Sequence, residues 1–193
     1  MKMSAAVPGL ILIASVLSAC ATRAPESGSA PALERAADAR AQFFAGLRQL
    51  CGQRFEGQMS FPADPKHDFA GKQLAAQVAS CTDSVVRVPF TVGEDRSRTW
   101  IFTHNAAGLE LKHDHRHADG TPDEQTMYGG MAGLTGSALS QSFAADDYTG
   151  KLIEGAATNV WTVSLSPDGQ RLTYHLERHA KPRFTAVLHR VAR

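Results

Sequence analysis

Three histidines at every second position form the most distinctive chemical pattern in this sequence. They belong to the segment 109–117, which reads LELKHDHRH. Alternate side chains of an extended strand point to the same side. One face of such a strand would carry two leucines followed by the three imidazoles: Leu109, Leu111, His113, His115 and His117. Because this face begins apolar and ends polar, we expect the strand to run from a packed core to a polar mouth or binding site.

A zinc ion is the first ligand that this spacing suggests. Histidines two residues apart on one strand face lie about 6.5–7 Å apart at the backbone, so two imidazoles can converge on one ion. His113 and His117 would be about 13 Å apart. We therefore expect any third ligand to come from elsewhere, such as His104 or His175. A catalytic zinc keeps one position open for a water molecule that it activates.

Two other interpretations of the histidine segment stay open. The imidazoles can form a solvated strand end that hydrogen-bonds to nearby acidic residues, or they can serve an organic ligand or acid–base chemistry. The opposite face of the segment is charged throughout and is predicted to be a wet surface with ion pairs between strands. It consists of Glu110, Lys112, Asp114 and Arg116.

No motif for a catalytic nucleophile or a phosphate-binding loop accompanies the histidines. The serines of the chain stand in no G-x-S-x-G setting. The segment Gly129–Gly136 (GGMAGLTG) lacks the lysine and the spacing of phosphate-binding loops. It is predicted to be a flexible corner or a place where the backbone passes close to a neighbour. The Asp146-Asp147 pair is typical of a solvated turn.

Hydrophobic periodicity predicts one helix followed by many short strands. From Pro31 to Leu50 apolar residues recur at spacings of three and four, which indicates a helix that packs on the domain rather than one that binds a partner. After Gly52 the period changes to two, as in half-buried strands. We expect strands at 55–61, 73–80, 84–92, 98–104, 109–117, 125–128, 139–143, 160–165, 172–176 and 184–191.

Strands joined in sequence by turns predict an all-β fold, an antiparallel meander that closes into a barrel. Closure would remove the exposed edges of the sheet, and a sandwich is the alternative. Pro89 inside a strand indicates an edge or a bulge. The bulky aromatic residues are expected in the core, although in a barrel some can line a cavity for an apolar ligand. They are Phe90, Trp100, Trp161, Tyr174 and Phe184.

The N-terminus has the pattern of a secretory signal. A hydrophobic run from Ala5 to Leu17 follows Lys2 and is too short to span a bilayer comfortably. It ends in Leu-Ser-Ala-Cys at positions 17–20, which resembles the lipobox of bacterial lipoproteins. That resemblance implies a signal peptide at 1–19 and acylation of Cys20, including a palmitate-like chain. Ala21 in place of an aspartate implies an outer-membrane location facing the periplasm.

Composition and cysteine usage agree with an envelope protein of one domain. Residues 20–30 are predicted to form the lipidated cysteine and a flexible tether, and residues 31–193 a single helix-plus-barrel domain. Loss of Lys2 would leave 19 basic and 19 acidic residues, a balance that argues against nucleic-acid binding. In an oxidising compartment Cys51 and Cys81 are expected to form a disulfide. A reactive thiol or a metal ligand is the alternative.

The histidine segment and its surroundings resemble a group of uncharacterised secreted or lipid-anchored bacterial proteins. The matching positions are Arg96–Trp100, Gly108-Leu109, Lys112–His117, Asp119-Gly120 and Tyr128–Gly130. The group carries no established activity, so the resemblance implies no catalytic role. A helix that leads into a meander is also similar to the calycin barrels, which include the lipocalins. Gly52–Phe55 resembles the lipocalin G-x-W start, with Phe55 one residue later than the tryptophan.

These observations favour a non-enzymatic barrel of the envelope that binds a small apolar or amphipathic ligand or an envelope partner. The alternative is a metal-dependent enzyme or a metal-binding protein that uses zinc on His113, His115 and His117.

Overall fold

A computed structural model of the chain describes Met1 and residues 29–192. The predicted signal peptide (1–19), Cys20 and most of the predicted tether (20–30) lie outside the described residues. The first helix begins at Ser29, two residues before the predicted start of the domain. Within the described part of the chain, none of the helices combines the length and the apolar character needed to cross a membrane.

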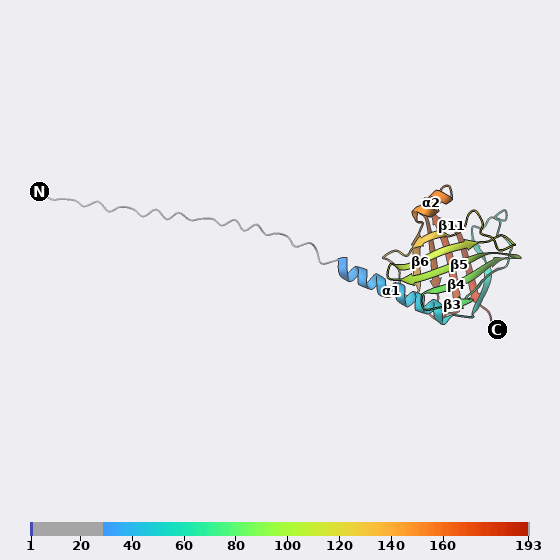
Figure 1. The fold of residues 1–193 in the computed structure, drawn as a ribbon, viewed down its shortest axis with the longest axis horizontal. Coiled ribbons are helices and arrows are strands. Elements are labelled where there is room, and N and C mark those ends of the chain that lie inside the picture. The colour runs from blue at the N-terminus through green and yellow to red at the C-terminus, as the bar shows by residue number, and fades with distance from the viewer. Residues whose placement is uncertain (2–28, 193) are drawn as a thin grey trace.

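Eleven strands of the described chain form one antiparallel sheet, one more than the ten predicted. The two-residue strand Ser80–Cys81 was not predicted as a separate strand, and the strand expected at 125–128 begins only at Tyr128. Ten of them follow the order β7-β6-β5-β4-β2-β1-β11-β10-β9-β8, and β3 pairs with β4 off this path. The strands are β1 (Arg54–Phe61), β2 (Leu74–Gln77), β3 (Ser80–Cys81), β4 (Val85–Val92), β5 (Asp95–Asn105), β6 (Gly108–His115), β7 (Tyr128–Met131), β8 (Ser140–Ala144), β9 (Asn159–Leu165), β10 (Arg171–Arg178) and β11 (Lys181–Arg190). Figure 1 shows them wrapped around a common interior.

The two ends of the sheet meet and nearly close the barrel, so the barrel prediction is confirmed over the sandwich. Ala132, just after β7, forms a bridge with Phe143 of β8. The backbone N–H of Gly133 also donates to the carbonyl of Ser142 at 2.9 Å. The short helices α2 (Asp147–Leu152) and η1 (Ala156–Thr158) then lead into β9.

Glycines make this close approach possible. A Cβ atom on Gly130 would lie 1.9 Å from the carbonyl oxygen of Ala144, and one on Gly129 would lie 1.9 Å from that of Leu111. Both contacts are with backbone, which cannot move aside cheaply. The prediction of close backbone approach in the segment Gly129–Gly136 is therefore confirmed. The prediction of a flexible corner is wrong for its first three residues, because they belong to β7.

Of the two predictions for Pro89, an edge or a bulge, the edge is wrong, because β4 is not an edge strand; the register of β4 against β5 does shift just after it, between Phe90 and Val92. β4 pairs with β5 on one side and with β2 and β3 on the other. The carbonyl of Arg87 accepts from Ala79, so the backbone of Pro89, two residues on, faces the same side. There β2 pairs only with residues 90–92 and β3 only with residues 86–87. Pro89 thus occupies the gap between them, where its missing N–H costs no ladder hydrogen bond.

The helix α1 (Ser29–Gln49) closes one end of the barrel with its second half. Phe43, Phe44 and Leu47 are buried, and the ring of Phe43 lies 6.4 Å from that of Phe102 on β5. Leu33 in the first half is 52% exposed. Figure 1 shows this half projecting from the barrel toward the N-terminus. The predicted packing of the helix on the domain is confirmed for its second half.

The predicted disulfide is also confirmed. Cys51, just after α1, is bonded to Cys81 of β3, with 6.2 Å between their Cα atoms. The bond joins the end of the helix to the wall of the barrel. At this end the interior is filled with apolar side chains, which include Leu109 and Leu111 of β6. Farther along the same face of β6 the interior opens.

Candidate functional site

A cavity of about 380 Å³ lies inside the barrel beyond the packed core. Side chains from seven strands line it, joined by the loop between β1 and β2 and by the end of α2. Seven of its sixteen lining residues are Phe, Trp or Tyr: Phe69, Phe90, Trp100, Tyr128, Trp161, Tyr174 and Phe184. All five aromatic residues predicted for the core or a cavity are buried and line it. Both tryptophans of the chain line the cavity.

The aromatic rings stand in two stacked groups, which give the cavity flat walls. In one, the ring of Trp100 stacks on those of Phe90 and Tyr174, with centroid separations of 4.6 and 4.5 Å and interplanar angles of 20° and 13°. In the other, Tyr128 stacks on His113 at 4.7 Å and 11° and approaches Trp161 at 5.7 Å. Planar surfaces of this kind favour planar or apolar ligands.

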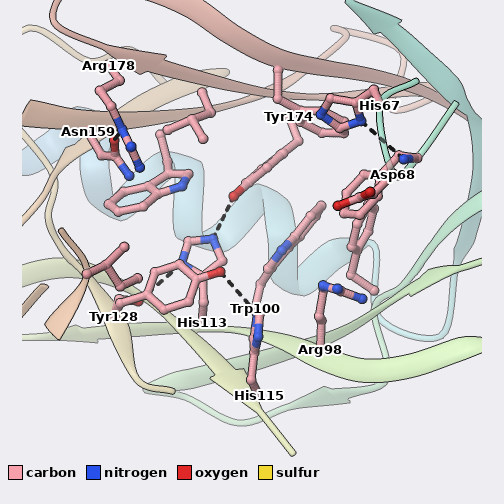
Figure 2. A pocket seen from close by; sticks show the side chains of 16 residues that line it. His67, Asp68, Arg98, Trp100, His113, His115, Tyr128, Asn159, Tyr174 and Arg178 are labelled. Carbon is pink, nitrogen blue, oxygen red and sulfur yellow. Dashed lines mark hydrogen bonds between the residues drawn. The ribbon is translucent and has the colours of Figure 1, made fainter. Parts of the chain in front are cut away.

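His113 joins the two groups through both of its ring nitrogens (Figure 2). Nδ1 lies 3.1 Å from the backbone carbonyl oxygen of Tyr128, and Nε2 lies 2.7 Å from Oη of Tyr174. A carbonyl oxygen can only accept, so Nδ1 carries the proton. Burial lowers the pKa of His113 to about 3, and the ring is neutral at pH 7. Nε2 therefore accepts, and the Tyr174 hydroxyl donates its only proton to it.

The two phenols of the site are neutral as well. Burial raises the pKa of Tyr128 to about 12 and that of Tyr174 well above its ordinary value. The hydroxyl of Tyr128 lies 3.1 Å from Nε2 of His115, which also lines the cavity. Burial, and next the charge of Arg98, lower the pKa of His115. The inner part of the cavity thus carries polar atoms but no net charge.

The predicted face of β6 runs from core to site, as expected, but its three histidines do not converge. His113 is 2% exposed and His115 is half-buried at the cavity, whereas His117 lies past the end of the strand with 54% of its side chain exposed. Nδ1 of His117 is 4.0 Å from a carboxylate oxygen of Asp123. Of the three histidines, only His117 fits the interpretation of a solvated strand end near acidic residues.

The predicted zinc site finds no ligand set here. Within residues 29–192 no three His, Cys, Asp or Glu side chains are grouped so that they could hold a metal ion. Both nitrogens of His113 already have protein partners. The suggested third ligands lie elsewhere: His104 stacks on Phe44 at 5.3 Å, and Nδ1 of His175 contacts Thr185 at 2.7 Å. The tyrosines occupy the positions at which a metal would have to bind the inner imidazole.

The charged face of β6 carries ion pairs, but not the predicted ion pairs between strands: within the described residues they lie inside the segment 110–116 or reach the N-cap of α2. Lys112 pairs with Asp146, the N-cap of α2, and with Glu110 at 3.7 Å. Asp114, however, is only 6% exposed rather than wet. It accepts hydrogen bonds from Arg116 Nε at 2.9 Å and from Thr126 Oγ1 at 3.2 Å. The segment after β6 folds back over this carboxylate, which the strand pattern alone does not reveal.

Two arginines line the cavity, and neither was predicted as a site residue. Arg98 is ion-paired with Asp95, and its guanidinium lies 5.3 Å from the ring centroid of Phe69. Arg178 donates from Nε to Oδ1 of Asn159 at 2.8 Å. It makes no ion pair with any residue that the structure describes. Both arginines follow the period of two from the inward-facing Trp100 and Tyr174, so this signal was present in the sequence.

The loop between β1 and β2 also contributes residues that no periodicity marks. His67 stacks on Phe184 at 5.8 Å, and Phe69 meets the same ring edge-on at 5.3 Å. Nδ1 of His67 accepts from the backbone N–H of Phe69 at 3.1 Å. Figure 2 shows His67 and Asp68 on the side of the cavity opposite Arg178 and Asn159. A loop residue enters the site only through the tertiary fold.

Comparisons of the chain with protein-family models, curated proteins and solved structures find no match. The function must therefore be argued from the cavity itself.

This arrangement suits ligand binding better than proton transfer. A general acid or base needs an atom that can reach the reacting proton and a pKa near the working pH. His113 is held neutral with both nitrogens engaged, and the pKa of each phenol lies far above 7. Flat aromatic walls with a few fixed polar atoms are the usual features of a site that holds a small molecule.

Proposed function

We propose that the protein is a lipid-anchored barrel of the bacterial envelope that holds a small amphipathic ligand. The observation that carries this proposal is the aromatic cavity of about 380 Å³. Pockets for small molecules commonly measure about 300–1,000 Å³ and combine apolar walls with a small number of placed polar groups. Here the polar groups are the hydroxyls of Tyr128 and Tyr174, Asn159 and the two arginines.

The anchor rests on the sequence pattern that ends in Cys20 and on the resemblance to lipoproteins of the outer membrane. The fold is compatible with it, because α1 follows the tether and covers one end of the barrel while the cavity occupies the other part. An anchor attached before α1 would leave the cavity accessible to molecules in the periplasm.

Cells that express the full chain are expected to incorporate labelled palmitate into it, and Cys20→Ser is expected to abolish the label. Cys51→Ser is the matched control, because it removes a cysteine of the domain and leaves the lipobox unchanged; it should keep the label. The measurement is autoradiography of the immunoprecipitated chain. Label that persists in Cys20→Ser would contradict the proposed anchor.

Binding in the cavity can be followed with 8-anilinonaphthalene-1-sulfonate, an anionic aromatic fluorophore. Every buried hydrophobic side chain of the described core lies between Ala36 and Leu188, so a chain that begins at Ala21 retains this core. Because Trp100 and Trp161 line the cavity, we expect energy transfer from them to one bound fluorophore per chain. Leu176→Tyr, which adds a ring to the cavity wall, should weaken binding at least about tenfold.

The matched control is Thr173→Tyr on the same strand. Residues 173 and 176 lie on opposite faces of β10, since alternate side chains of a strand point to opposite sides. This variant should bind the fluorophore like the unmodified chain. Non-saturable binding, or equal weakening by the two tyrosine substitutions, would contradict a ligand site inside the barrel.

A further inference from the structure

The hydroxyl of Tyr174 in the cavity can accept but not donate a hydrogen bond, and this restricts the ligands that can bind there. The inner polar atom is Oη of Tyr174, whose proton is donated to His113. That donation follows from the other hydrogen bond of the imidazole, in which Nδ1 donates to the carbonyl of Tyr128. Oη of Tyr174 can therefore only accept a further hydrogen bond. A ligand group that meets it must bring its own O–H or N–H.

An acidic group cannot take this inner position favourably. A carboxylate has only acceptor atoms, so it would face the lone pairs of Tyr174 among aromatic rings. The cation whose charge acts on this phenol, Arg98, is already ion-paired with Asp95. The ring of Tyr174 is surrounded by those of His113, Trp100 and Phe184, with centroid separations of 5.9, 4.5 and 6.1 Å. Burying an unpaired charge in such surroundings is unfavourable. The acid of an amphipathic ligand must lie elsewhere.

Arg178 provides the complementary position. It lies on the same face of β10 as Tyr174, four residues farther along, or about 13 Å at the backbone. Its Nε is held by Asn159, its cross-strand neighbour in the register of β9 and β10. The two Nη groups stay available for an anion, because Arg178 forms no ion pair within the described chain. Arg98, in contrast, is already paired with Asp95.

The path between these two positions is apolar and flat. Leu176 lies between Tyr174 and Arg178 on the inward face of β10, and its cross-strand partner is Trp161. Both side chains line the cavity. An aromatic ring system that runs along β10 would pack on the indole of Trp161, as aromatic pairs do. Two fused rings with substituents at opposite ends have a length suited to this path.

We propose that the cavity selects an aryl acid that carries a hydrogen-bond donor at the opposite end of its rings. The acid binds Arg178, the rings pack on Trp161 and Leu176, and the donor bonds to Oη of Tyr174. This inference rests on the proposed ligand-binding function and narrows it to one chemical class, hydroxyaryl acids and their N–H counterparts.

Three naphthalene compounds test separately the hydrogen-bond donor for Tyr174 and the acid for Arg178. 6-Hydroxy-2-naphthoate has both groups, 6-methoxy-2-naphthoate lacks the donor, and 2-naphthol lacks the acid. Titration calorimetry on the chain from Ala21 is expected to show the hydroxy acid binding about tenfold more tightly than the methoxy acid and at least about tenfold more tightly than 2-naphthol.

Two variants assign these preferences to their residues. Tyr174→Phe is expected to bring the ratio between the hydroxy and methoxy acids to about one. Arg178→Gln is expected to do the same for the ratio between the hydroxy acid and 2-naphthol. Arg171→Gln, an exposed arginine of the same strand, is the matched control and should keep both ratios. Ratios within one variant are used because a general loss of stability does not change them.

The outcomes distinguish this inference from the function on which it rests. Equal affinities of the three compounds in the unmodified chain would overturn the selectivity, and so would ratios that persist in the two variants. If Tyr174→Phe or Arg178→Gln does not fold, the affinity ratios of the three compounds in the unmodified chain decide whether the selectivity exists. If none of the three compounds binds while the anilinonaphthalene fluorophore does, the selectivity is wrong and the ligand-binding function stands. If that fluorophore also fails to bind, both proposals fail.

Discussion

Acidification from about pH 7 to pH 4 is expected to lower the free energy of unfolding by about 3 kcal/mol through His113 alone. Burial lowers the pKa of this imidazole from 6.5 to about 3. Above pH 6.5 it is neutral in both states and contributes no pH dependence. Below pH 6.5 the unfolded chain takes up a proton that the folded protein does not. Stability is therefore lost as the pH falls from 6.5 toward 3, at up to about 1.4 kcal/mol per pH unit.

The surroundings of His113 support this direction. The side chain is buried between Tyr128, Tyr174 and Trp161, with ring centroids 4.7, 5.9 and 5.1 Å away. The phenols remain neutral at these pH values. After burial, the hydrogen bond to the carbonyl of Tyr128 raises the pKa of His113, and the nearby charges of His115 and Lys112 lower it further.

Urea unfolding at a series of pH values, followed by fluorescence, measures this contribution on the chain from Ala21. The variant His113→Gln should be less stable at pH 7 but lose about 3 kcal/mol less than the unmodified chain between pH 7 and pH 4. Some acid sensitivity should remain in both, because the pKa of Asp95 is lowered to about 2 and that of Asp146 is also lowered.

The matched control is His117→Gln at the other end of the same histidine pattern. This side chain is 54% exposed and belongs to no buried hydrogen-bond network of the described chain. Its replacement should leave the pH profile of stability unchanged. Parallel profiles for His113→Gln and the unmodified chain would show that His113 is not held neutral by burial.

Removal of the Cys51–Cys81 bond is expected to lower the free energy of unfolding by about 3–4 kcal/mol. The two cysteines are 30 positions apart, so the bond closes a loop of that length in the unfolded chain. In the chain-entropy description the bond stabilises the folded protein by restricting the unfolded ensemble. In the folded protein it also joins the end of α1, which covers one end of the barrel, to β3.

Urea unfolding of the double variant Cys51→Ser/Cys81→Ser, compared with the oxidised chain, measures the effect. The unmodified chain after reduction and alkylation is the control, and it should unfold at nearly the same urea concentration as the double variant. Two free thiols in the unreduced chain from Ala21 would contradict the bond. An unchanged unfolding midpoint in the double variant would contradict its stabilising role.

Local periodicity was enough to predict the architecture of β6 and of the barrel. Whether a side chain faces the core or the solvent depends on its own position in a strand, which the spacing of apolar residues records. Leu109 and Leu111 are buried and His113 and His115 reach the cavity, as the alternation predicts. The same signal marks Arg98 and Arg178 on inward faces, although only the cavity gives these positions meaning.

The spacing of the histidines could not distinguish a metal site from a hydrogen-bonded network. A His-x-His pattern places two imidazoles on one face in either case. The difference lies in what meets their nitrogens, and here tyrosine hydroxyls and a backbone carbonyl do. Tyr174 is 61 positions from His113, and no local pattern connects the two residues.

The sequence by itself therefore determined the strand pattern, the helix, the cysteine pair and the polarity of the β6 face, because each depends on neighbours along the chain. Only the tertiary structure decided the order of the strands, the close approach of β7 and β8 at Gly130, and the contacts of His113. These depend on register and closure, which are properties of the whole sheet. The direction of the Tyr174 hydrogen bond, on which the proposed selectivity rests, follows from these contacts between strands far apart in the sequence.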